Sequence, residues 1–189
     1  IGKNAVAEHQ GVVYWLGVDG QFRVYSGGAP QIIECPIRRE VIDNLAPSQN
    51  EKIYAGVNAE YNEIWFCYPD KRDGNGLECS RIAVFDFAQN IWWKGLMARS
   101  TWIAPQPYEK PITFDPGDGR AYFQERGNTA NGNQIEWFLE TGKFNIEDGD
   151  KLFTVHRYVP DFENQVGNVN VTFTPHQFQR SVPYAAQSG

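Results

Sequence analysis

Short runs of aromatic and β-branched residues, each ended by glycine, proline, asparagine or aspartate, constrain the fold of this chain more than any other feature. Among its 189 residues are 6 Trp, 9 Tyr and 12 Phe, together with 18 Gly and 11 Pro. Aromatic and β-branched residues favour strands, whereas the interrupting residues favour tight turns. Long helical periodicity is nearly absent. The pattern therefore predicts an all-β protein built from many short strands.

The first predicted strands cover residues 12–16, 22–25 and 31–35, with turn residues between them. Strands joined this closely form an antiparallel meander. One short helix is expected next, because apolar residues recur at helical spacing between Pro36 and Pro47. Proline is tolerated near the first turn of a helix, and a later proline ends the run.

A second group of strands repeats the pattern of the first. The segments 52–57, 63–68, 81–87 and 91–94 predict a four-stranded antiparallel sheet. Trp15 and Trp65 occupy matching places in the two groups, 50 residues apart. A repeat of about 40–50 residues is typical of a propeller blade. A third group begins at 112–114 and returns at 121–123.

The chain is predicted to change its architecture after Gly127. Residues 1–127 are interpreted as a partial antiparallel β-propeller of two to three blades. Residues 128–189 are interpreted as a last propeller strand and the start of a second, β-sandwich-like domain, with strands over 134–139, 152–159 and 168–174. Since two or three blades cannot close a ring, and the chain does not begin with Met, we expect a fragment of a longer protein.

The charge balance argues against electrostatic binding to nucleic acid or anionic lipid. The chain has 17 Lys and Arg against 23 Asp and Glu, a net charge of −6. An acidic protein repels phosphate unless basic residues cluster locally, and the sequence holds no such cluster. No uninterrupted apolar run approaches the roughly 20 residues that a membrane-spanning helix needs, so no membrane anchor is expected.

The cysteines and histidines do not form a recognisable site. Cys35, Cys67 and Cys79 are odd in number and widely spaced, which indicates free thiols in a reducing cytoplasm rather than a disulfide framework. The histidines are far apart, with no cysteine or histidine at metal-ligand spacing (His9, His156 and His176). No metal site is expected from these residues.

Acidic glycine-containing turns are the next candidates for chemistry. They lie at residues 70–74, 115–119 and 147–150. Carboxylates in such turns can bind calcium, but these turns lack the alternating ligands and final glutamate of a calcium loop. Simple turns are the main interpretation, and calcium binding stays the minor alternative.

Paired carboxylates for glycoside hydrolysis are not evident either. Glu34, Asp86 and Glu136 alternate with apolar residues, as on the solvent face of a strand, so burial is not expected to raise the pKa of any carboxyl. The sequence has no Gly-x-Ser-x-Gly motif, phosphate-cradling loop or Cys/His nucleophile pair. We therefore expect neither enzymatic activity nor a cofactor. The tryptophans are interpreted mainly as core, with stacking on sugars or bases as the alternative.

A series of short segments between about residues 9 and 178 carries a family likeness. In chain order they read VYWLGVDGQFRVYSG (13–27), CPIR (35–38), YAGVN (54–58), NEIWFCYP (62–69), VFDF (84–87), NIW (90–92), ARSTW (98–102), ETGKFNIEDGD (140–150), PDF (160–162) and VNVTFT (169–174). In order and spacing they resemble the tail nozzle proteins of short-tailed bacteriophages, also called tail tubular or packaged-DNA-stabilisation proteins.

The resemblance implies a non-enzymatic structural protein. Members of this family form a homo-oligomeric ring, a hexamer, below the portal and adaptor of the virion. Double-stranded DNA is retained in and passes through the lumen without sequence-specific binding. The implied location is the virion tail, after synthesis in the bacterial host cytoplasm. The acidic charge suits a DNA conduit, because each cationic contact adds affinity for phosphate and retards passage.

Two alternatives remain open beside the nozzle. One is a glycan-binding or glycan-hydrolysing propeller of a receptor-binding tail protein, and the other is a propeller that acts as a protein-interaction scaffold. An interaction surface is predicted on the loops 69–80 and 103–111, because long polar or proline-rich loops on a rigid sheet often carry contacts. The candidate contact residues are Asp70, Asp73, Tyr108 and Glu109.

Overall fold

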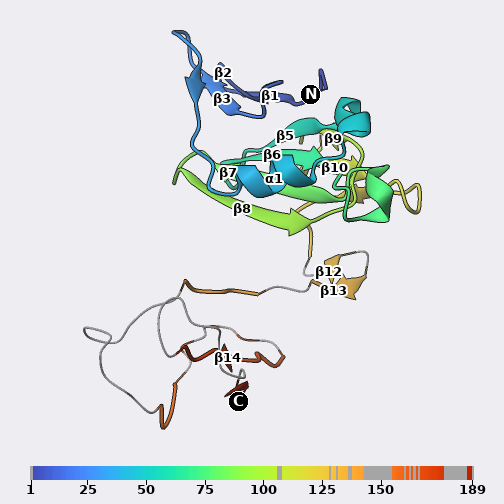
Figure 1. The fold of residues 1–189 in the computed structure, drawn as a ribbon. Helices are drawn as coiled ribbons and strands as arrows, with labels where there is room; N and C mark the ends of the chain where they lie inside the picture. The colour runs from blue at the N-terminus through green and yellow to red at the C-terminus, as the bar shows by residue number, and fades with distance from the viewer. Residues whose placement is uncertain are drawn as a thin grey trace. The chain divides into compact units, whose positions relative to one another are not determined.

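The computed structural model describes residues 2–105, 108–127, 129–130, 132–135, 138–142, 155–159, 161, 163, 165, 167–176 and 187–188. The described chain is mostly β, with small antiparallel sheets and few helices (Figure 1). The predicted all-β class is confirmed at this level. The chain divides into two compact units, Ile1–Asn131 and Gly132–Gly189, and the prediction of a propeller followed by a second β domain is taken up below as a proposal.

The first sheet contains four antiparallel strands in the order β1-β2-β3-β4. Their bounds are β1 (Val6–His9), β2 (Val12–Leu16), β3 (Phe22–Tyr25) and β4 (Gln31–Ile32). The sequence predicted β2 and β3 at these bounds, but it missed β1. β1 is fixed by pairing with β2, from Val6 opposite Trp15 to His9 opposite Val12, rather than by its own composition.

The second sheet is the predicted four-stranded meander, in the order β5-β6-β7-β8. Its strands are β5 (Tyr54–Asn58), β6 (Glu63–Tyr68), β7 (Arg81–Asp86) and β8 (Ile91–Leu96). The turn between β7 and β8 forms because Asp86 Oδ1 accepts the amide N–H groups of Ala88 and Gln89 at 2.9 and 2.8 Å. Asn90 completes it with a left-handed φ of 57°.

The helices fill the connection between the first two sheets. They are the short α1 (Arg38–Asn44) and the 3₁₀ helix η1 (Pro47–Lys52), with a further 3₁₀ turn η2 (Gly74–Gly76) in the β6–β7 loop. Pro47 ends the predicted helix but also begins η1, because proline suits the first helical position. A Cβ on Gly20, which has φ +71°, would lie 3.2 Å from the Ile42 side chain of α1.

A third sheet, in the order β11-β10-β9, follows. It consists of β9 (Trp102–Ile103), β10 (Ile112–Phe114) and β11 (Ala121–Phe123), and the unit ends with β12 (Thr129–Ala130). The sequence predicted β10 and β11. It missed the two-residue β9, which forms only because Trp102 lies opposite Thr113 in the sheet.

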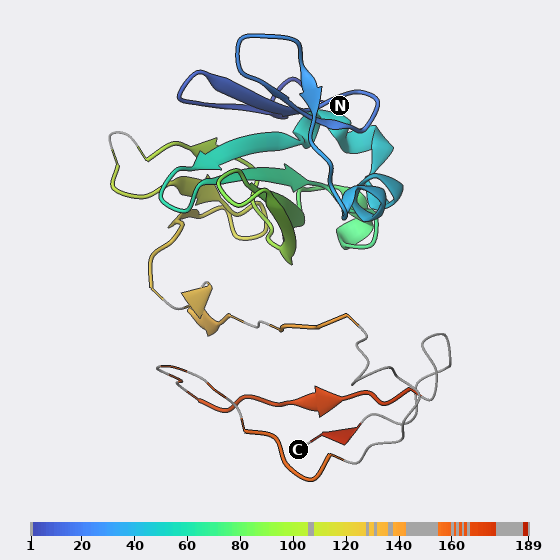
Figure 2. The same cartoon turned by 90° about the vertical axis from the view of Figure 1, so that its left-hand side faces the viewer.

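Alternate side chains of the second sheet fill two separate cores. Ile64 and Phe66 point into the core shared with the first sheet, where Phe22 lies with its ring centroid 5.0 Å from that of Phe66. Trp65 points to the opposite face, where its ring lies 5.3 Å from that of Trp102. The second sheet is therefore covered on both faces, and Figure 2 shows the first sheet stacked upon it.

The first strands of the three sheets are neighbours. β1 contacts β5, and β5 contacts β9. Just before β1, the carbonyl oxygen of Asn4 accepts the amide of Ala55 at 2.8 Å. On the other side, a Cβ on Gly56 would lie 2.3 Å from the Trp102 ring, so this glycine lets the third sheet approach.

The second unit departs from its predicted strands. The bounds observed are β13 (Asn133–Gln134), β14 (Thr172–Phe173) and β15 (Gln187–Ser188). Of the predicted 134–139 strand, only Gln134 lies in a strand among the described residues, because the apolar side chains that follow have little to pack against: Phe138 is 84% exposed. Residues 155–159 form no strand, whereas 151–154 lie outside the described residues. Within 168–174, only β14 forms.

All three cysteines are free thiols, as predicted. Cys67 and Cys79 are buried, and Cys35 is half-buried. Burial raises the pKa of Cys35 to about 11 and that of Cys79 to about 12, so these thiols stay protonated. Among the helices that the structure describes, none has the length and apolarity to cross a membrane.

Candidate functional site

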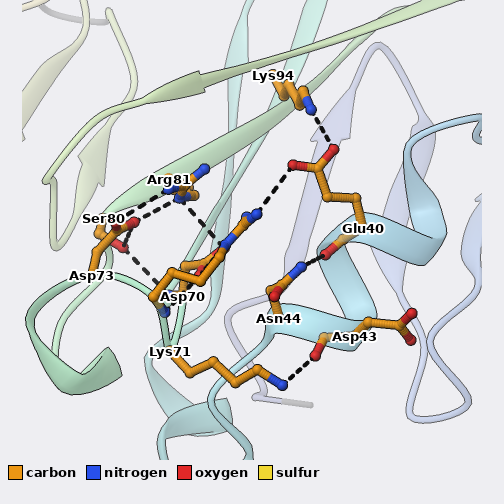
Figure 3. A network of polar contacts seen from close by, with 10 residues as sticks. Glu40, Asp43, Asn44, Asp70, Lys71, Asp73, Ser80, Arg81 and Lys94 are labelled. Atoms are coloured by element: carbon orange, nitrogen blue, oxygen red, sulfur yellow. Dashed lines mark hydrogen bonds and ion pairs between the residues drawn. The ribbon is translucent and has the colours of Figure 1, made fainter. Parts of the chain in front are cut away.

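The predicted interaction loop 69–80 is anchored by a network of charges, shown in Figure 3. At its centre is Asp70, whose side chain is fully buried. Its Oδ1 accepts the backbone N–H and the Nε–H of Arg72, both at 2.9 Å, and its Oδ2 accepts Nη2–H of Arg72 at 2.6 Å. Arg81 Nε lies 3.4 Å from the same Oδ2. Two guanidinium groups thus neutralise one buried carboxylate.

The network continues from the loop to α1 and β8. Arg81 donates to both carboxylate oxygens of Asp73, at 2.6 and 3.1 Å. Arg72 lies 3.4 Å from Glu40 of α1, which also pairs with Lys94 of β8. We call Glu40, Asp70, Arg72, Asp73 and Arg81 the loop network. It joins α1 to the loop before β7 and to the first residue of β7, and Lys94 extends it to β8.

Ion pairing keeps the carboxyl groups of the loop network charged. Burial alone raises the pKa of Asp70, but the hydrogen bonds from Arg72 outweigh it, and the resulting pKa lies below the usual value. The hydrogen bond from Arg81 lowers the pKa of Asp73, and that from Lys94 lowers the pKa of Glu40. These side chains are therefore committed to holding the loop in place.

The predicted contact residues lie at opposite ends of β6. Asp70 and Asp73 follow that strand, and Asp70 is buried rather than presented to a partner. Tyr108 is 48% exposed, and Glu109 is also exposed. Their neighbour Lys110 pairs with Glu60, which precedes β6. The structure brings Asp70 and Asp73 together but does not join them to Tyr108 and Glu109.

A second group of polar residues lies at this other end of β6. We call Asn58, Glu63 and Glu125 the carboxylate cluster. Asn58 is 1% exposed, and its side-chain nitrogen donates to Glu63 Oε2 at 3.2 Å and to Glu125 Oε1 at 3.3 Å. One buried amide is thus shared by two carboxyl groups, one from the second sheet and one that follows the third.

Two indole groups complete the surroundings of Glu63. Trp65 Nε1–H donates to Oε2 at 2.7 Å, and Trp93 Nε1–H donates to Oε1 at 3.2 Å. The rings of Trp65 and Trp93 meet edge to face with centroids 5.9 Å apart. Both carboxylate oxygens of Glu63 are therefore bonded within the protein.

Glu125 corrects one expectation from the sequence. Burial raises the pKa of the Glu125 carboxyl, and the negative charges of Glu63 and Glu60 raise it further. The prediction that no carboxyl has a burial-raised pKa is therefore wrong at this position. Nothing in the local sequence around Glu125 marks it, because its environment is built by residues more than 60 positions earlier in the chain, such as Asn58.

Of the aromatic residues interpreted as core, Tyr14, Trp65 and Phe66 are buried. Trp93 departs from that interpretation, because it is 38% exposed on β8. Trp137 lies outside the described residues.

The acidic turn at 115–119 uses its carboxylates internally. Asp115 Oδ2 accepts from Arg99 at 2.8 Å, and Oδ1 accepts the Gly117 amide at 2.8 Å. Asp118 accepts the hydroxyl of Tyr122. Within the described part of the chain, no group of His, Cys, Asp or Glu side chains is arranged to hold a metal ion. The turn at 147–150 lies outside it.

Comparison with known proteins adds no family assignment. Neither a protein-family model nor a curated protein matches this chain. What the protein does is therefore argued from the residues and contacts described above.

Proposed function

We propose that this chain is part of a phage tail nozzle, a non-enzymatic component of the virion tail. In this proposal the parent protein forms a hexameric ring below the portal and adaptor, and the ring retains and passes packaged double-stranded DNA. The observation that carries the proposal is the serial arrangement of four-stranded antiparallel sheets with neighbouring first strands. The sequence resemblance supplies the family.

A partial propeller accounts for that arrangement. In a propeller, each blade is a four-stranded antiparallel sheet, and the blades stand around a common axis. The sequential order of strands in the first two sheets, and the contacts of β1 with β5 and of β5 with β9, support blades that begin beside one axis. We propose two to three such blades here, followed by the start of a β-sandwich-like domain.

The way in which basic side chains are used supports a conduit for DNA. Several lysine and arginine side chains are paired with carboxylates of the same chain: Arg23, Lys52, Arg72, Arg81, Lys94, Arg99 and Lys110. A cation that is already paired contributes less to phosphate binding. Together with the net charge of −6, this pairing favours free passage of DNA over binding of its phosphates to the protein.

The direct test is immunogold electron microscopy of phage particles from the lysate that contains this protein. We expect gold at the tail, below the capsid vertex. An absence of gold on particles, with the protein soluble in the lysate, would overturn the proposal. Sedimentation of the parent protein tests the ring separately, and a monomer that never enters virions would contradict it.

The glycan alternative has one observation in its favour. Trp93 is exposed and donates its indole N–H to Glu63, a pairing of an aromatic ring and a carboxylate that suits a sugar. However, both Glu63 oxygens and the indole N–H groups of Trp65 and Trp93 are already bonded to one another. We therefore place this function second to the nozzle. If the protein bound or cleaved host surface glycans and Trp93→Ala abolished that activity, the glycan function would be favoured instead.

The scaffold alternative is best tested on the exposed part of the predicted interaction surface. Tyr108→Ala with Glu109→Lys changes exposed side chains, whereas charge reversal at Asp70 would disrupt the loop network. If the 103–111 loop contacts neighbouring tail proteins, the double variant should enter particles less efficiently while its unfolding midpoint stays unchanged. Normal incorporation would remove this surface from the proposal.

A further inference from the structure

We propose that Glu125 is a proton-sensitive clamp between the second and third sheets. Protonation of its carboxyl group tightens the attachment of the third sheet, and ionisation loosens it. The proposal rests on the carboxylate cluster and is independent of the nozzle function.

The clamp spans two sheets through one side chain. Asn58 ends β5, Glu63 begins β6, and Glu125 follows β11. Because Asn58 donates to both carboxyl groups from a buried position, these groups are held near each other in a poorly solvated place. Two negative charges in such a place repel each other, and one proton removes the repulsion.

The contacts determine which carboxyl group takes the proton. Glu63 accepts the indole N–H groups of Trp65 and Trp93 as well as the amide of Asn58, and donors of this kind stabilise the charged form. Glu125 accepts the longer bond from Asn58, at 3.3 Å. The proton is therefore expected on Glu125.

The charged groups around Glu125 also favour its protonated form on balance. Glu63 and Glu60, in the β5–β6 hairpin, are negative. Lys110, in the segment before β10, is positive but is paired with Glu60. Burial and the two glutamates raise the pKa of Glu125, against the smaller opposing effects of Lys110 and the Asn58 hydrogen bond. Arg126, the next residue, lies over the Phe123 ring at 5.7 Å.

The backbone transmits the state of Glu125 to the third sheet. Glu125 has a left-handed φ of 54°, which is unfavourable for a residue with a side chain. The preceding Gln124 is buried, its amide bonds to the carbonyl of Pro111 at 2.8 Å, and its side chain donates to Thr113 at 2.6 Å. Because Gln124 is bonded to Thr113 of β10 and to Pro111, the residue just before β10, repulsion at the adjacent Glu125 acts on β10 and β11.

A carboxyl group whose pKa is raised by folding stabilises the folded state when it is protonated and loses that stabilisation as the pH rises through the folded pKa. The third sheet should thus become better protected as the pH falls from neutral toward the pKa of Glu125.

The experiment is hydrogen exchange on the full chain, read as protection factors for amides of β9–β11 between pH 4 and 8. We expect wild-type protection to increase by several fold as the pH falls. Glu125→Gln, which imitates the protonated carboxyl, should have higher protection than the wild type near neutral pH, a flat profile, and protection that the wild type approaches as the pH falls. Glu109→Gln, an exposed residue on the neighbouring loop, is the matched control and should follow the wild type.

Equal pH profiles for wild type and Glu125→Gln would overturn the clamp, and so would lower protection in the variant at all pH values. If the variant does not fold, a carbon-13 NMR titration of the wild-type side chain decides the matter. An apparent pKa for Glu125 above that of an ordinary glutamate supports the clamp, and a value at or below it contradicts the clamp.

Discussion

Asp70 is a fully buried carboxylate in a loop that the sequence predicts as an exposed interaction surface. Its environment depends on Arg72, two residues away, and on Arg81, which lies beyond the loop. The sequence could predict a turn here from Asp and Gly. It could not predict burial, because the position of Arg81 relative to Asp70 is set by the pairing of β6 with β7.

Asp70→Asn is expected to destabilise the protein by about 2–3 kcal/mol, because it removes the charge that two guanidinium groups face. Urea unfolding followed by tryptophan fluorescence measures this change. Asp43→Asn is the matched control, since that carboxylate forms an exposed pair with Arg39 and should change stability by less than about 0.5 kcal/mol. Equal effects for the two variants would show that the loop network contributes no more than an exposed pair.

The second sheet is the element that sequence patterns predicted best. Its central strands are continuous apolar runs, which suits strands covered on both faces. β1 and β9 were missed because their pairing partners determine them. The opposite error occurs at 134–139, where an apolar run predicts a strand although Phe138 and Leu139 are largely exposed. An apolar run reveals a strand only when another layer covers it.

Gly56 tests how closely the second and third sheets approach. In Gly56→Ala the new Cβ would lie 2.3 Å from the Trp102 ring, so Trp102 has to move. We expect a loss of about 1–3 kcal/mol in the free energy of unfolding, with a change in tryptophan fluorescence. Gly28→Ala is the control, because nothing lies within 4 Å of its added Cβ. Unchanged stability in Gly56→Ala would show that the third sheet packs loosely.

At the scale of the whole molecule, the sequence predicts that sheets repeat along the chain, but it does not predict how the sheets contact one another. The correspondence of Trp15 with Trp65 predicted a repeated sheet, with three strands in the first group and four in the second, and both sheets form with four strands each. The neighbouring positions of β1, β5 and β9 depend on packing between residues that are far apart in the chain, for which no local pattern exists. The carboxylate cluster was missed for the same reason.

Acid should have opposite effects on stability at the two ends of β6: it should weaken the loop network and strengthen the attachment of the third sheet. The pKa values of Glu40, Asp70 and Asp73 are lowered, so their stabilisation is present at neutral pH and is lost as the pH falls through those lowered values. Thermal unfolding at pH 7, 5 and 3 should therefore show a falling midpoint that is flatter in Asp70→Asn. An equally steep fall in that variant would assign the acid sensitivity to other groups.

The pairing of Lys94 with Glu40 has a consequence for how copies of this protein meet. β8 ends its sheet, and Ile91 and Leu96 are exposed along it. Lysine on an outer strand normally guards against fibril-like stacking with other chains. Here the Lys94 ammonium group is paired with Glu40 of α1 in its own molecule, although the Lys94 side chain stays 46% exposed. A chain that approaches this outer strand therefore meets a lysine charge that is partly compensated from within the same molecule, beside two exposed apolar side chains.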